Sequence, residues 1–243
     1  MQNHLKQFVG LVALLASSST AMAQESDWNY GATIYLFAPE TTVSMGDVEG
    51  SLDFSDALEN LDMAFMGAFE ANNGSWGVLA DYMLTDLTFS QSTPGPAFSG
   101  LSTSLKTQIL NGYVTYRAYQ TPTVNFDVAA GFRWFDTKTK MTLSAGTAPG
   151  RSTSVNDNWT DPVIGARVNF QMSDKWTGMA FADYGGFSSD STTWQVLLTA
   201  DYQFNENWVG RLGYRKISVD HKINGSDFKY EQSGPLLGVT YKF

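Results

Sequence analysis

The chain contains no cysteine among its 243 residues, so no disulfide can hold it together. Small exported domains commonly depend on disulfides, and this one must be stabilised in another way. A lipoprotein is also excluded, because its lipid anchor would need a cysteine at the end of a leader. Charged residues make up only 16% of the chain, well below the roughly 25% of a typical soluble domain.

Long hydrophobic runs are missing too. No segment after residue 23 offers the roughly 18 apolar residues that a membrane-spanning helix needs. Near the start, Lys6 precedes a short apolar run at residues 8–16 and then Ala21-Met22-Ala23, the pattern of a Sec-type signal peptide with its cleavage site. We therefore expect residues 1–23 to be removed and residues 24–243 to form one domain.

Several function classes are disfavoured by what the mature chain lacks. Removal of the leader takes away one lysine and no acid, which leaves 14 basic and 24 acidic residues. Such an acidic product binds nucleic acid poorly. No phosphate loop, dinucleotide fingerprint, serine elbow or zinc motif occurs. We therefore expect no nucleic-acid partner, no cofactor, no bound metal and no catalytic residues.

The last segment of the chain is an alternating one. In residues 234–243, Leu237, Val239, Tyr241 and Phe243 share one face, and the residues between them are mostly small or polar. This is the period of a β-strand with one apolar side. Chain ends usually fray, but a closed membrane barrel must pair its last strand with its first. We interpret the segment as a closing strand that the barrel-insertion machinery recognises by its aromatic end.

The rest of the mature chain repeats such segments. Short turns lie near residues 72–75, 120–123, 173–175 and 205–207, and mostly longer connections lie near 38–61, 91–101, 145–157, 186–192 and 221–227. Short periplasmic turns and longer extracellular loops are typical of bacterial outer-membrane barrels. We predict an all-β fold with a single closed antiparallel transmembrane barrel of about ten strands. The range is eight to twelve, because an extra hairpin fits between Thr41 and Phe54.

Aromatic residues, 14% of the chain, recur beside the short turns. Rings of this kind are favoured at the boundary between lipid and water. The alternative is that they are core aromatics of a soluble β-sandwich, but the repeated register favours a membrane girdle. The predicted membrane-interface aromatics are Trp76, Phe170, Trp176, Phe204, Trp208 and Phe243.

The same alternation assigns six acids and five arginines to the inward face. Arginine facing lipid would cost about 2–4 kcal/mol near the bilayer midplane, so the inward assignment is favoured. We interpret these residues as a charge network that fills a narrow barrel with a structural or surface-interaction role. The alternative is the lining of a small-solute, porin-like channel. The predicted network is Glu70, Asp81, Arg117, Asp127, Arg133, Asp161, Arg167, Asp183, Asp201, Arg211 and Arg215.

Two further features could carry chemistry. His221 is the only histidine after the leader, and it lies beside Asp220 at the outer end of a predicted strand. An outer-membrane hydrolase or acyl-modifying enzyme could use such a rim position, although a polar rim residue is the simpler interpretation. The first long connection holds acids that could bind Ca²⁺, but their spacing is not that of an EF-hand, so we interpret them as surface charge. These acids are Asp47, Glu49, Asp53, Asp56, Glu59 and Asp62.

Five segments together resemble uncharacterised proteobacterial outer-membrane β-barrel proteins, similar in class to the small OmpA- and OmpW-like barrels. The resemblance implies the fold, a location in the Gram-negative outer membrane and contact with its lipids, and it implies no activity. The segments that carry it are residues 54–70, 159–167, 183–187, 213–215 and 234–238.

Overall fold

The computed structural model describes residues 28–45, 48–52, 55, 59, 61–93, 95–223 and 225–243. The predicted signal peptide, residues 1–23, therefore lies outside the described residues. Within the described part of the chain, no helix is long and apolar enough to cross a bilayer.

The described residues form twelve antiparallel strands in one sheet. In chain order they are β1 (Asn29–Phe37), β2 (Glu40–Met45), β3 (Val48–Leu52), β4 (Leu61–Asn72), β5 (Trp76–Gln91), β6 (Phe98–Gln120), β7 (Val124–Ala145), β8 (Arg151–Gln171), β9 (Trp176–Gly185), β10 (Ser191–Gln203), β11 (Trp208–Ile223) and β12 (Ser226–Lys242).

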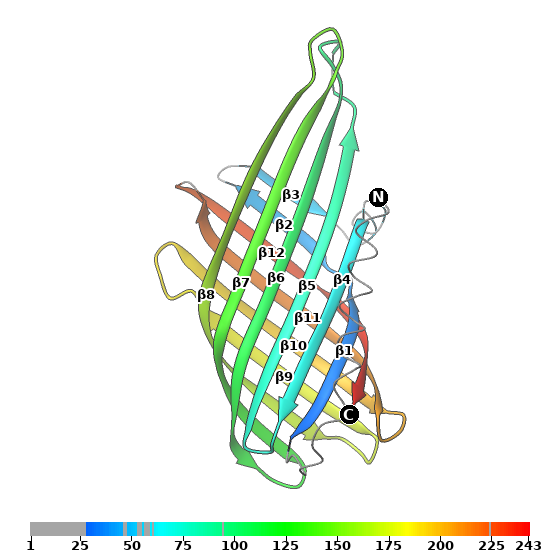
Figure 1. Ribbon diagram of the computed structural model, residues 1–243, viewed down its shortest axis with the longest axis vertical. Coiled ribbons are helices and arrows are strands. Elements are labelled where there is room, and N and C mark those ends of the chain that lie inside the picture. Colours follow the sequence, from blue (N-terminus) through cyan, green and yellow to red (C-terminus); the bar gives the residue numbers. More distant parts are fainter. Residues whose placement is uncertain are drawn as a thin grey trace, which may run out of the picture.

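Ten of these strands close into a ring (Figure 1). The order runs from β1 to β4 and then through β5 to β12, and β12 pairs back with β1 from Gly31↔Lys242 to Phe37↔Leu236. The predicted ten-stranded closed barrel is confirmed, with the last alternating segment as its closing strand. The hairpin allowed for between Thr41 and Phe54 is also present: β2 and β3 form it, and β2 extends the sheet along β12 above the ring.

The two ends of the barrel differ. The short turns at 73–75, 121–123, 172–175 and 204–207 lie at the same end as the start of β1 and the end of β12. At the other end, β5 to β8 rise beyond the remaining strands (Figure 1). The predicted loops at 91–101 and 145–157 are therefore wrong in extent, because β6 begins at Phe98, β7 continues to Ala145 and β8 begins at Arg151.

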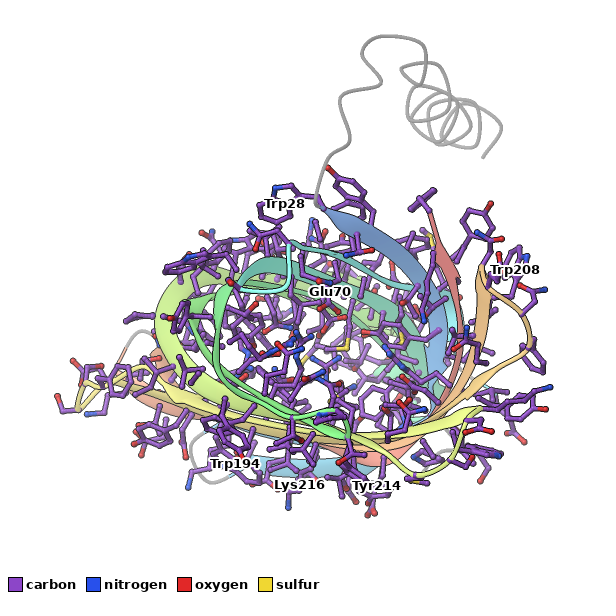
Figure 2. All side chains as sticks on the ribbon, turned by 90° about the horizontal axis from the view of Figure 1, so that it is seen from below. Trp28, Glu70, Trp194, Trp208, Tyr214 and Lys216 are labelled. Carbon is purple, nitrogen blue, oxygen red and sulfur yellow. The ribbon has the colours of Figure 1, made fainter. Side chains whose placement is uncertain are left out.

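The outward face carries the apolar band that a bilayer requires. On β11 and β12 it includes Leu212, Leu237 and Val239, which are 59%, 63% and 40% exposed. All six predicted interface aromatics are exposed, and Trp76, Trp176 and Trp208 each pack on a neighbouring tyrosine ring. Viewed along the barrel, Glu70 lies inside the wall, whereas Trp194, Trp208, Tyr214 and Lys216 lie outside it (Figure 2).

Deleting Phe243 is expected to reduce membrane insertion. Its amide donates a hydrogen bond of 3.0 Å to the carbonyl of Tyr30, so the residue belongs to the ladder that closes the ring. The measurement is the fraction of protein in the outer membrane that shows heat-modifiable migration in gels. Phe204→Ala, which removes another exposed aromatic ring near the same boundary, should insert almost normally. Equal insertion of the deletion variant and the wild type would contradict this role.

Candidate functional site: the charged network inside the barrel

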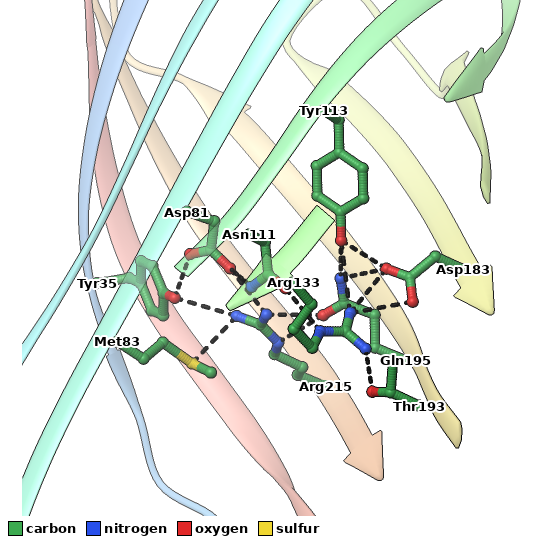
Figure 3. A network of polar contacts seen from close by, with 10 residues as sticks. All are labelled: Tyr35, Asp81, Met83, Asn111, Tyr113, Arg133, Asp183, Thr193, Gln195 and Arg215. Atoms are coloured by element: carbon green, nitrogen blue, oxygen red, sulfur yellow. Dashed lines mark hydrogen bonds and ion pairs between the residues drawn. The ribbon is translucent and has the colours of Figure 1, made fainter. Parts of the chain in front are cut away.

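The centre of the network is Arg133, which projects inward from β7 and is 1% exposed. Its Nη2 lies 2.9 Å from a carboxylate oxygen of Asp183, its Nε donates to Asn111 at 2.7 Å, and its Nη1 donates to Thr193 at 2.6 Å. Both Tyr113 and Gln195 also donate to Asp183. The ion pair is thus enclosed by neutral polar groups that satisfy its remaining hydrogen-bonding capacity (Figure 3).

Arg215, on the opposite wall, joins this centre to a second carboxylate. Its Nη2 lies 2.7 Å from Asp81 and also donates to Gln195 Oε1 at 2.7 Å. The hydroxyl of Tyr35 donates to the other oxygen of Asp81 at 2.5 Å. Because Gln195 contacts both Arg215 and Asp183, the two ion pairs form one network across the lumen (Figure 3).

A second layer lies nearer the end of the barrel that carries the short turns. Arg167 bridges Glu70 and Asp127 at 2.8 and 2.9 Å, and Arg117 pairs with the second oxygen of Asp127. Arg211 and Asp201 form a bidentate pair at 2.9 and 2.7 Å. Together with the pairs of Arg133 and Arg215, these contacts place all five predicted arginines in ion pairs with predicted acids.

The eleventh predicted residue, Asp161, is held differently. It is 5% exposed and accepts hydrogen bonds from Trp159 Nε1 at 3.1 Å and from the Ser191 hydroxyl at 2.8 Å. Its register partner on β7 is Arg133, but the Arg133 guanidinium pairs with Asp183 instead. Opposite positions in a ladder therefore share a face without being ion-pair partners.

Apolar side chains fill the lumen directly above this network. Phe135, Ile109 and Ile217 each lie two residues beyond an inward polar residue on their own strands, and all three are at most 1% exposed. Phe135 stacks on Trp159 at 4.7 Å and meets the ring of Tyr230 at 5.2 Å. We call Ile109, Phe135, Ile217, Val219, Phe228 and Tyr230 the apolar plug.

The half of the lumen nearer the short turns is partly hollow. A cavity of about 90 Å³ lies between Arg211 and Arg215, and one of about 210 Å³ opens beside Phe243 at the mouth. Both are lined by Glu70 and Leu79. The interior is therefore filled at the network and the plug, and open toward the end that carries the short turns.

His221 lies near the end of β11 that is remote from the short turns. Its ring stacks on Trp159 with centroids 3.9 Å apart and planes 5° apart, and its Nδ1 is buried without a hydrogen-bond partner in the described residues. Asp220 is the adjacent strand residue, so it faces the other side, where it lies 3.8 Å from Lys229. The pair Asp220–His221 therefore does not form a dyad on one face.

The first-connection acids are only partly visible. Asp47, Asp53 and Asp56, and the side chain of Glu49, lie outside the described residues, while Glu59 and Asp62 are exposed. Within the part of the chain that the structure describes, no cluster of three or more metal-ligating side chains occurs.

Sequence reasoning found the charges and missed their neutral partners. Tyr35, Asn111, Tyr113, Thr193 and Gln195 complete the network, and all five are buried. The signal was available, because Asn111 and Tyr113 share the parity of Arg117 on β6. Uncharged residues can face either side of the wall at little cost, so parity alone does not single them out.

The fold was compared with known proteins. No protein-family model matches the chain, and no curated protein sequence matches it. Among solved structures, the outer-membrane protease OmpT of Escherichia coli is similar at 11% identity, covering 93% of this chain and 100% of that one, with a TM-score of 0.54. The translocator domain of the autotransporter NalP from Neisseria meningitidis is 16% identical, covers 99% and 96%, and has a TM-score of 0.40.

The attachment protein Ail of Yersinia pestis is 13% identical, with coverage of 89% and 98% and a TM-score of 0.39. At such low identity, the likeness to OmpT shows the fold alone. Together with the closed ring and the apolar band, it shows that this chain is an outer-membrane β-barrel with a buried charged network inside.

Removing the Arg133 guanidinium is expected to destabilise the barrel strongly. Arg133→Ala leaves Asp183 buried and without its ion-pair partner, a change that typically costs about 3–5 kcal/mol. Urea unfolding in lipid vesicles, followed by tryptophan fluorescence, measures the free energy of unfolding. The control is Lys229→Ala, which breaks an exposed pair and should change that free energy by less than about 1 kcal/mol. Equal effects of the two variants would contradict the network's structural role.

Proposed function

We propose that this barrel does not conduct solutes and instead holds an extended sheet, formed by the outer parts of β5 to β8, outside the cell as an interaction surface. The observation that carries the proposal is strand length. β6, β7 and β8 have 23, 22 and 21 residues, whereas β9 has 10. A strand needs about 9–11 residues to cross the bilayer, so each long strand has about ten residues to spare.

The two faces of this projecting sheet differ in chemistry. Its inner face bears Leu105, Met141 and Val155, of which Met141 and Val155 are 46% and 41% exposed. Its outer face carries Lys138 and Lys140 beside many hydroxyl residues. Exposed apolar side chains on an otherwise polar extension favour a contact with another molecule rather than solvent alone.

The interior supports a structural role over transport. A solute would have to pass the apolar plug and then the crossed Arg133 and Arg215 side chains, each 1% exposed. Opening such a path requires separation of buried ion pairs. The small-solute channel remains the alternative function, favoured by the hollow periplasmic half.

We also propose that the protein is not a rim enzyme. The stacking of His221 on Trp159 and the outward direction of Asp220 support a packing role for the histidine. A nucleophile or base would need a hydrogen-bonded partner on its own face.

Conductance distinguishes the two leading functions. Purified wild-type protein in planar bilayers is expected to give no discrete current steps, because the plug and the network fill the lumen. The matched control is Phe135→Gly combined with Ile217→Gly, which removes two plug side chains and should make any residual leak larger. Regular steps from the wild type would favour the channel.

Surface presentation can be tested cleanly because the chain has no cysteine. Met141→Cys and Thr142→Cys place single thiols on the inner and outer faces of the projecting sheet, and Ser173→Cys places one in a short turn. On intact cells, a membrane-impermeant maleimide should label the first two and leave Ser173→Cys unlabelled until the outer membrane is permeabilised. Labelling of Ser173→Cys alone would reverse the orientation and overturn the proposal.

A further inference from the structure

Among the residues that the structure describes, the barrel wall has an opening between β1 and β4. In the described residues, the ladder between these strands ends at the Ile34↔Gly67 pair. Above this pair, β1 continues to Phe37 along β12, whereas the outer part of β4, from Leu61 to Met66, pairs with β5. The two strands thus separate part of the way up the wall.

Two prolines, Pro39 and Pro235, lie where the strands separate. At Ala38 and Pro39 the chain leaves β1 and resumes as β2, which pairs with β12 from Glu40↔Ser233 onward. Pro39 has no amide hydrogen, and the residue before a proline is restricted, so the chain bends here instead of continuing beside β4. Across the bend, the amide of Ala38 donates to the carbonyl of Pro235 at 3.0 Å, which fixes the edge of the opening to β12.

A cavity of about 310 Å³ occupies the opening. Its deep lining includes Phe37, Met66 and Leu236, which face inward and are 6%, 5% and 3% exposed. Its rim includes Leu36 and Leu237, which face outward and are 70% and 63% exposed. The cavity therefore connects the inside of the wall to its lipid-facing side.

The lining carries no charged side chain among the described residues, and its polar groups have partners. Gln232 donates to the Thr41 hydroxyl at 3.2 Å, and Thr85 interacts with the hydroxyl of Tyr230. The remaining lining is aliphatic, proline, phenylalanine or methionine. A neutral hydrocarbon fits this chemistry, because a charged or strongly polar ligand would lose its hydration without gaining a partner.

The level of the rim identifies where the hydrocarbon comes from. Leu36 pairs in register with Leu237, and Leu237 with Leu212, so three leucines form one outward row. Two positions toward the outer end on the same face, the lipid-facing residues are Tyr214 and Pro235, and polar residues begin beyond them with Lys216 and Ser233. The row thus lies within the apolar band, where the neighbouring molecules are lipid tails.

We propose that this lateral opening binds one acyl chain of a membrane lipid, taken directly from the surrounding bilayer. The chain passes between the leucine row and the bend at Pro39, and its end lies against Met66 and Leu87. The cavity volume of about 310 Å³ is at the lower end of the roughly 300–1,000 Å³ typical of small-molecule sites, so the cavity suits part of one acyl chain.

The test uses a phosphatidylcholine with a diazirine near the end of one acyl chain, incorporated at low density into vesicles that contain the full barrel. After photolysis and digestion, mass spectrometry maps the labelled residues. Labels should concentrate on the deep lining, on Met66, Leu87 and Leu236. Lipid-facing residues remote from the opening, such as Ile164 and Leu198, serve as the internal reference for ordinary bilayer contact.

The matched variants are Ala64→Phe, which fills the cavity from β4, and Ala80→Phe, which adds the same ring to the lipid-facing side of β5. Ala64→Phe should lower labelling of the deep lining several-fold and leave labelling of Leu198 unchanged, whereas Ala80→Phe should change neither. Heat-modifiable migration verifies that each variant is folded. Equal labelling of the deep lining and the remote residues in the wild type would overturn the proposal, whatever the behaviour of the variants.

Discussion

The ladder between β1 and β12 is the constraint on which the rest of the structure depends. Within a bilayer each unpaired backbone group costs several kcal/mol, so a sheet is viable there only when its first and last strands meet. Closure with ten strands gives a narrow lumen in which side chains from facing walls touch. That narrowness allows Arg215 on β11 to reach Asp81 on β5, and Gln195 to connect two ion pairs.

The buried ion pairs are better understood as devices of specificity than as sources of net stability. Removing two charges from water costs about as much as their attraction returns, unless further hydrogen bonds satisfy them. Here those bonds come from Asn111, Thr193 and Tyr113. The guanidinium of Arg133 thereby joins β7 to β6, β9 and β10, so these bonds favour one relative register of strands that are distant in the sequence.

Much of this architecture could be predicted from the period-2 pattern, and its failures have physical reasons. Within the bilayer, one face of each strand must be apolar, so the parity of Asp127 or Arg167 was readable. Outside the bilayer both faces are hydrated, and residues such as Ser152, Ser154 and Asn156 carry no alternation, so the extent of β8 was predicted too short. The partner choice of Asp161 depends on rotamers across the lumen, and the opening above Ile34 depends on where a ladder stops. Neither the partner of Asp161 nor the end of the β1–β4 ladder can be predicted from the alternation within a single strand.

Because β5 to β8 rise beyond the remaining strands (Figure 1), the sequence of their outer parts can vary separately from the rest of the barrel. The projecting sheet is built from consecutive strands, so one uninterrupted stretch of chain supplies the whole extension. In the described residues, the tip of the β7–β8 hairpin donates backbone hydrogen bonds to Pro96 and Ala97 in the β5–β6 connection and pairs with no strand on the shorter side of the ring. Its length or sequence can therefore be altered by local insertion or exchange without disturbing the lipid belt, the closing ladder or the buried network, which makes the rigid barrel a platform on which the outer surface varies independently.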